Sequence, residues 1–170
     1  MKNINLNSDI GEGFGVYDIG NDTEMLKIVN SANIACGFHA GDPNVMDRVV
    51  KQSIKNGVSI GAHPGFNDLW GFGRRQIQMS TDEIEASVAY QIGALQAISA
   101  TNNAIVTHVK PHGALNNMSS LDPAIAPAIA RGVNLVDPKL ILVAVSGSFL
   151  FSAGQALGLT VAAEAYADRS

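Results

Sequence analysis

Short apolar runs alternate with longer amphipathic stretches along this chain of 170 residues. Short apolar runs bounded by glycine or polar turns indicate buried strands, whereas longer stretches with apolar residues three or four apart indicate helices. The pattern predicts strands over 3–9, 32–37, 57–62, 104–109, 139–145 and 158–163. It predicts helices near 22–30, 43–56, 80–102, 122–132 and 148–157.

Three helix boundaries carry recognisable signals. Asp42 precedes Pro43, and proline is favoured in the first turn of a helix. Ser80 is followed three residues later by Glu83, the spacing of a capping box. Gly132 is predicted to end the helix near 122–132, because glycine adopts the left-handed conformation common after helices.

Alternating strands and helices predict a parallel sheet with right-handed crossovers. Two closures fit, an open doubly wound sheet or a TIM-like β/α barrel. Polar residues after each of the first four strands favour the barrel, in which every strand end reaches a common mouth. The chain stops at AEAYADRS, soon after the sixth predicted strand. We therefore expect one domain over 1–170, a barrel truncated at its C-terminus.

Composition narrows the class of protein. Hydrophobic residues at 46% and charged residues at 15% fit a folded α/β protein. A net charge of −4 without a basic stripe argues against nucleic acid as a partner. The start MKNINLNSD lacks an apolar signal core, and no apolar run has membrane-spanning length. We expect a cytoplasmic protein without a membrane partner, whose single cysteine, Cys36, is a buried core residue.

Histidines follow the predicted strands. His39 and His63 end the second and third strands, and His108 and His112 bracket the end of the fourth. Asp9 and Glu12 follow the first strand. Because the carboxyl ends of parallel strands converge, imidazoles and carboxylates should meet on one face. This arrangement predicts an enzyme.

Each of these residues also has a structural interpretation. Asp9 and Glu12 can bind a cation, orient an imidazole or act as general bases, or they can cap a turn and face solvent. His39 can be a structural hydrogen-bonding group. Strand alternation puts His108 and Lys110 on one face, where Lys110 can stabilise charge or carry a proton. His108 lies earlier in the strand and fits the core equally well.

The segment 61–75, GAHPGFNDLWGFGRR, is rich in glycine and aromatic residues and predicts a long active-site loop. Phe66, Trp70 and Phe72 can exclude water from a substrate. Arg74 and Arg75 offer forked donors for a carboxylate or phosphate, or they are surface charges.

A metal site has weak support in the sequence. Asp9, His39 and His63 could bind a divalent ion, although they lie on different strands without a short ligand spacing such as H-E-x-x-H. The chain has no G-x-x-x-x-G-K-[ST] phosphate loop and no G-x-S-x-G nucleophile elbow. These absences argue against ATP binding by this chain and against a serine hydrolase.

Several long segments resemble the LamB/YcsF family. They are LNSDIGEGFG, ANIACGFHAGDP, IGAHPGFNDLWGFGRR, VKPHGALNN and AEAYADR, in the order of that family and over nearly the whole chain. The resemblance implies a seven-stranded β/α barrel of the glycoside hydrolase/deacetylase type. Family members continue past ADR, which also implies that the last elements are missing here.

The resemblance further implies the A component of an ATP-dependent 5-oxoprolinase, which opens 5-oxo-L-proline to L-glutamate together with B and C subunits. ATP would be bound by those partners. Asp9 or Glu12 would position water, with His39 and His63 as acid, base or metal ligands. The remaining roles are oxyanion or phosphate stabilisation by Lys110 and His112, and substrate binding by Asn7, Phe66, Arg74 and Asn116.

Two other functions stay open. A metal-dependent deacetylase or carbohydrate hydrolase of the same barrel superfamily would bind a divalent metal and need no partners. A non-catalytic binding chain would show no turnover. A truncated barrel exposes a sheet edge, so self-association into a homo-oligomer is also expected.

Overall fold

The computed structural model describes residues 4–166. Its six parallel strands form one sheet, and each strand pairs with the next strand of the sequence. Such a sequential order is that of a β/α barrel, whereas an open doubly wound sheet reverses its strand order. The strands are β1 (Asn7–Ile10), β2 (Ser31–Ala35), β3 (Ser59–His63), β4 (Val106–Val109), β5 (Ile141–Val145) and β6 (Val161–Glu164).

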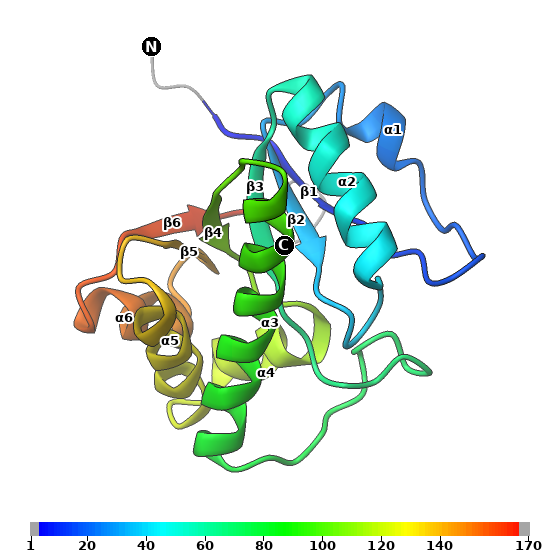
Figure 1. The fold of residues 1–170 in the computed structure, drawn as a ribbon. Coiled ribbons are helices and arrows are strands. Elements are labelled where there is room, and N and C mark those ends of the chain that lie inside the picture. The colour runs from blue at the N-terminus through cyan, green and yellow to red at the C-terminus, as the bar shows by residue number, and fades with distance from the viewer. Residues whose placement is uncertain (1–3, 167–170) are drawn as a thin grey trace.

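Helices follow one another around the outside of this sheet (Figure 1). α2 contacts α3, α3 contacts α5, and α5 contacts α6. α2, α3 and α6 contact the strands directly, and α5 packs against α3 and α6. The helices are α1 (Asp22–Met25), α2 (Pro43–Asn56), α3 (Thr81–Thr101), α4 (Gly113–Leu121), α5 (Ile125–Val136) and α6 (Phe149–Ala156).

The sheet curves so that its two edge strands approach each other across its inner face. The Asn7 side chain on β1 donates to Glu164 Oε1 on β6 at 3.1 Å. Lys110, just after β4, lies between them and contacts carboxylates of both strands. The expected TIM-like architecture is therefore present as a curved, half-barrel sheet. A seventh strand is not found among residues 4–166, and the expected truncation stays a prediction.

Two helix starts agree with their sequence signals. Asp42 Oδ1 accepts from the backbone N–H groups of Asn44 and Val45 at 2.8 and 3.0 Å. The Ser80 hydroxyl accepts from Glu83 N, and Glu83 Oε2 accepts from Ser80 N, which completes the capping box. These side chains satisfy N–H groups that have no partner within the helix.

Other helix boundaries predicted from the sequence were wrong. The helix near 22–30 is only the four residues of α1, and α4 was not expected. Gly132 does not end a helix but lies inside α5, where a Cβ would come 2.8 Å from the Glu85 carbonyl oxygen on α3. Its lack of a side chain lets α5 approach α3 closely, so space rather than backbone conformation explains this glycine.

The core lies between the helices and the outer face of the sheet. It includes Ile34 and Ala62 on the strands, Val49 and Ile92 on the helices, and Cys36, which is buried as predicted. No helix among the described residues is long and apolar enough to cross a membrane. The inner face of the sheet is different, because polar side chains occupy it.

Candidate functional site

Side chains from four successive strand ends meet at one mouth of the curved sheet. Asp9 and Glu12 come from β1 and its following loop, His39 from the loop after β2, and His63 from the end of β3. His112 directly precedes α4. Parallel strands direct all of these segments toward the same end, which brings together residues far apart in the sequence.

Three imidazoles form the centre of this mouth. The rings of His39 and His112 are stacked at 3.6 Å between centroids and 6° between planes. His63 stands edge-on to both, and its Nε2 lies 3.0 Å from His112 Nδ1. Glu12 Oε1 lies 3.1 Å from His39 Nε2 and 3.5 Å from His112 Nδ1. We call Glu12, His39, His63 and His112 the histidine cluster.

Backbone carbonyls fix the protonation of two of these rings. His63 Nδ1 lies 2.6 Å from the Lys110 carbonyl oxygen, and His112 Nε2 lies 2.8 Å from the Phe72 carbonyl oxygen. A carbonyl only accepts, so each of these nitrogens carries a proton. The other nitrogens, His63 Nε2 and His112 Nδ1, therefore direct lone pairs into the cluster.

Burial shapes the acid–base properties of the cluster. It lowers the pKa of His39 to about 3, with a further contribution from His63. It lowers the pKa of His112 to about 4, helped by His63 and His39. Burial also raises the pKa of Glu12, against the attraction of His63 and His112. A carboxylate of raised pKa is suited to accept a proton near neutral pH.

The donor atoms of the histidine cluster fit a divalent metal ion. They all lie within 4.8 Å of one another. Bonds of about 2.0–2.1 Å in a tetrahedral zinc site put ligand atoms roughly 3.3 Å apart, close to the separations found here. The carbonyl partners of His63 and His112 are those that orient metal-binding imidazoles. Of the predicted metal candidates, His39 and His63 belong to this set, whereas Asp9 lies beside it, 3.4 Å from His63 Nε2.

A second group of charges lies deeper, on the inner face of the sheet. Lys110 Nζ lies 3.2 Å from Asp9 Oδ1 and 2.8 Å from Glu164 Oε1, and it donates to Asn7 Oδ1 at 3.2 Å. Burial would lower the pKa of Lys110, but Asp9 and Glu164 outweigh it and raise that pKa. Burial would raise the pKa of Asp9, yet His63 and Lys110 hold it well below its usual range. Asp9 and Lys110 therefore form a charged pair.

Three of the remaining predicted site residues, Phe66, Asn116 and Arg74, lie outside the histidine cluster. Phe66 is only 2% exposed and packs in the hydrophobic core rather than at the mouth. Asn116 is buried in α4, and no hydrogen bond within residues 4–166 joins its side chain to the cluster. Arg74 is exposed, with its guanidinium 5.5 Å from the centre of the Phe72 ring.

An apolar groove of about 520 Å³ opens beside the histidine cluster. Trp70, which is 98% exposed, and Phe72 are among its lining residues. Glu12 and His39 lie at one side of the groove, so it reaches the reactive groups directly. Its remaining lining residues are Phe14, Tyr17, Ile19, Ala40 and Leu69.

Three buried polar residues were missed by sequence reasoning. Glu164 at the end of β6 pairs with Lys110, and Asn33 on β2 donates to Asp9 Oδ1 at 2.9 Å. Asp68 binds the Arg75 guanidinium and the Gly71 N–H, which shapes the loop after β3. Glu164 follows the sixth strand as the histidines follow theirs, so the same strand-end signal could have found it. Asn33 lies in the middle of an apolar run and gave no such signal.

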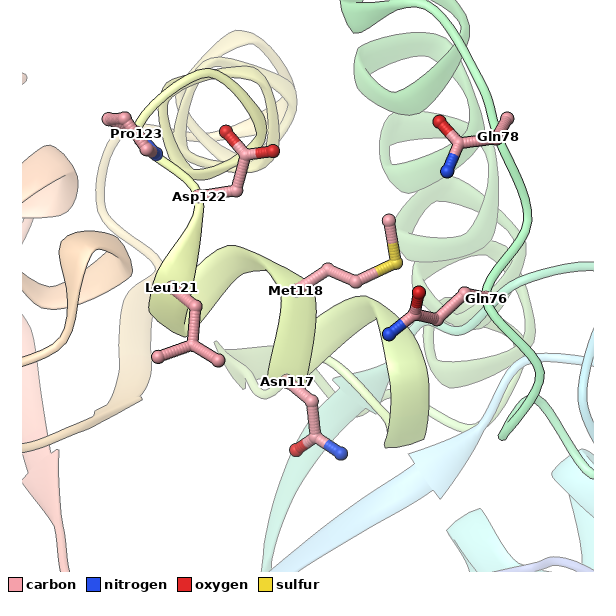
Figure 2. A pocket seen from close by; sticks show the side chains of 7 residues that line it. All are labelled: Gln76, Gln78, Asn117, Met118, Leu121, Asp122 and Pro123. Atoms are coloured by element: carbon pink, nitrogen blue, oxygen red, sulfur yellow. The ribbon is translucent and has the colours of Figure 1, made fainter.

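A second hollow of about 530 Å³ lies between α4 and the segment before α3, and none of its lining residues belongs to the histidine cluster. Figure 2 shows that its lining side chains are mainly amides and aliphatic groups, with Asp122 as its one carboxylate. Asp122 is the single titratable side chain among these lining residues, so the histidine cluster is the better candidate for chemistry.

Known proteins resemble the chain over nearly its full length. It is 55% identical over 169 residues to the 5-oxoprolinase A subunit of Natranaerobius thermophilus, covering 99% of this chain and 66% of that protein. It is 56% identical over 170 residues to the 5-oxoprolinase A subunit of Geobacillus kaustophilus, covering 100% of this chain and 66% of that protein. The chain thus spans about two thirds of the length of these relatives.

A solved structure has the same fold. The crystal structure of the lactam utilization protein from Thermus thermophilus superposes with a TM-score of 0.97 at 43% identity. The match covers 99% of this chain and 68% of the Thermus chain. Residues 4–170 also match the sequence pattern of the LamB/YcsF family. The chain therefore belongs to the LamB/YcsF family.

Proposed function

We propose that this chain acts as the A component of an ATP-dependent 5-oxoprolinase in the cytoplasm and opens 5-oxo-L-proline to L-glutamate. The identity of 55–56% with relatives of that name, over 99–100% of this chain, carries the proposal. The histidine cluster and the Asp9–Lys110 pair supply suitable acid–base groups. These relatives favour the lactam reaction over a deacetylase or a non-catalytic role.

The reaction adds water to the lactam carbonyl carbon, breaks the ring C–N bond and moves a proton to the departing nitrogen. A five-membered lactam resists this hydrolysis, and coupling to ATP supplies the driving force. The chain has no phosphate loop of the G-x-x-x-x-G-K-[ST] type. We therefore propose that the B and C subunits bind ATP and transfer its γ-phosphoryl group to the lactam oxygen, leaving ADP. One water then opens the ring and a second releases the phosphoryl group as inorganic phosphate, which yields L-glutamate.

Within the mouth, Glu12 is the preferred base for the attacking water because its pKa is raised and its Oε1 faces the imidazoles. Asp9 Oδ2 would orient the same water from the side of His63. Lys110 would stabilise negative charge on the carbonyl oxygen or a phosphate. The role expected of His112 in this step does not fit, because the N–H of its neutral ring is bound to the Phe72 carbonyl oxygen. Arg74 at the rim would hold the substrate carboxylate, while Trp70 and Phe72 exclude water.

A divalent metal ion would be held by the histidine cluster, Glu12, His39, His63 and His112. Such an ion, when bound, would polarise the lactam oxygen and make water more acidic. With the ion bound, Glu12 would be a ligand rather than the base, and Asp9 Oδ2 would remain the carboxylate oxygen that orients the water. The carbonyls of Lys110 and Phe72 hold His63 and His112 in place, and Asp9 stays beside His63.

The test is glutamate formation from 5-oxo-L-proline and ATP by this chain mixed with the B and C subunits. The full-length A component from Geobacillus kaustophilus serves as the positive control. We expect turnover that requires all three components and falls by at least about 100-fold in Asp9→Ala and His63→Ala. Full activity of either variant would refute these roles. No turnover by the wild-type chain, beside an active control, would refute the proposed function for this chain.

A further inference from the structure

A row of polar side chains crosses the inner face of the sheet beneath the mouth, outside the histidine cluster. The Thr107 hydroxyl lies 2.9 Å from His108 Nδ1, and His108 Nε2 lies 3.1 Å from Asn33 Oδ1. Asn33 Nδ2 in turn donates to Asp9 Oδ1 at 2.9 Å and to Asn7 Oδ1 at 2.7 Å. The row links β4 to β1 through β2.

The direction of each hydrogen bond in the row follows from the Asp9 carboxylate, the acceptor at its end. The ionised Asp9 carboxylate only accepts, so the NH2 group of Asn33 faces it and the amide oxygen faces His108. His108 must then carry its proton on Nε2. Its unprotonated Nδ1 lies 2.9 Å from the Thr107 hydroxyl, whose single proton is shared between this nitrogen and the Ile60 carbonyl oxygen at 3.0 Å. Burial lowers the pKa of His108 to about 4, in keeping with a neutral ring.

This row determines which oxygen of Asp9 reaches the mouth. Oδ1 receives the Asn33 amide at 2.9 Å and the Lys110 ammonium at 3.2 Å from the inner side. Oδ2 is the oxygen 3.4 Å from His63 Nε2, and the Asp9 side chain is 37% exposed. The carboxylate is thus anchored by one oxygen and presents the other to the reactive groups.

Strand β3, next to β4, leaves space for the His108 imidazole. A Cβ on Gly61 of β3 would overlap the imidazole of His108. The pairing of β3 with β4 also shifts register between Ile60 and Gly61, opposite Thr107. Glycine and the irregular pairing together open the space in which His108 reaches Asn33.

We propose that His108 is a positioning residue, which acts through Asn33 to hold the Asp9 carboxylate with Oδ2 toward the mouth. The inference rests on the proposed function, because the orientation of Asp9 matters only if Asp9 orients water there. His108 itself does not contact substrate. Its task is to fix the amide of Asn33 in one of two orientations.

The hydrogen-bond direction can be tested without catalysis. Long-range 15N–1H NMR of the histidine rings in the full chain reports the tautomer, and His108→Gln identifies the His108 signals. We expect the neutral Nε2–H tautomer at pH 7. A neutral Nδ1–H tautomer or an imidazolium would overturn the inference, whatever the activity of the protein.

The positioning role is tested by kinetics of the complex with the B and C subunits. His108→Phe keeps a ring but loses the donor to Asn33, and we expect kcat to fall about tenfold with KM for 5-oxo-L-proline unchanged. His108→Gln can place an N–H near the position of Nε2 and should recover most of kcat. Circular dichroism and thermal unfolding establish equal folded fractions before rates are compared.

A double-mutant cycle separates positioning from general structural damage. If His108 acts through Asn33, adding His108→Phe to Asn33→Ala should change kcat less than twofold. If the losses in kcat of the two single variants multiply in the double variant, the inference is overturned. It is also overturned if the His108→Phe complex is as fast as an active wild-type complex. An inactive wild-type complex would instead refute the proposed function, and the tautomer measurement would still decide the hydrogen-bond direction.

Discussion

His63 Nε2 and His112 Nδ1 lie 3.0 Å apart, although neither carries a proton when both rings are neutral. Their protons are committed to the carbonyl oxygens of Lys110 and Phe72. Two lone pairs at this distance repel each other unless a cation lies between or beside them. A divalent metal ion bound by both nitrogens would remove this repulsion.

A metal site in the histidine cluster predicts stoichiometric binding of zinc. Isothermal titration of the chelator-treated chain with Zn²⁺ should give about one ion per chain, and His112→Ala should weaken binding at least tenfold because one ligand is lost. His108→Gln is the matched control, since His108 lies outside the cluster, and it should bind zinc normally. A folded wild-type chain that binds no zinc would contradict the assignment of the histidine cluster as a zinc site.

Lys110→Met should destabilise the protein strongly. The substitution leaves the Asp9 and Glu164 carboxylates without their shared buried ammonium. We expect a loss of about 3–5 kcal/mol in the free energy of unfolding, measured by urea titration at pH 7. Lys51→Met, which breaks an exposed pair with Asp47, should cost at most about 0.5 kcal/mol. Equal losses in the two variants would contradict the importance assigned to the inner pair.

Gly73→Ala should disturb the stacked His39 and His112 rings. The residue has a φ of +62°, and a Cβ would come 2.7 Å from His39 Cβ and 2.9 Å from His112 Cδ2. We expect glutamate formation to fall more than tenfold and the unfolding free energy to fall by more than about 1 kcal/mol.

Gly57→Ala is the control for this change, because Gly57 has a φ of +67° with nothing within 4 Å of an added Cβ. It shares the backbone strain but not the steric clash, so it should lose about 1 kcal/mol of stability and keep its activity. Comparable losses of activity in both variants would show that strain, rather than ring displacement, causes the effect.

Asp68 should make stability depend on acid pH. Hydrogen bonding from Arg75 lowers the pKa of Asp68 to about 2, compared with about 3.9 in an unfolded chain. The unfolded state therefore takes up a proton first as pH falls, and the stabilisation present above pH 4 disappears between about pH 4 and 2. Urea unfolding should show that the stability gap between wild type and Asp68→Asn narrows over this interval. A gap that stays constant from pH 5 to pH 2 would contradict the assignment.

The alternation of apolar and amphipathic segments determined the succession of strands and helices. Strands and long helices form where apolar residues repeat at the spacing of one buried face, and this spacing is a local property of the sequence. The predicted element boundaries were wrong where tertiary contacts outweighed this local spacing. α5 continues through Gly132 because α3 packs against that position, a contact between segments far apart in the chain.

The sequence also determined which residue types stand at the strand ends. Asp9, His39, His63 and His112 were identified because polar groups follow apolar strands there, and parallel strands share one direction. Only the tertiary structure decided how these groups are paired. In the folded protein, Glu12 and His112 join the histidine cluster, and Asp9 pairs with Lys110. Phe66 is buried in the core. Pairing depends on the curvature of the sheet and on loop geometry, which arise from packing of the whole chain rather than from local spacing.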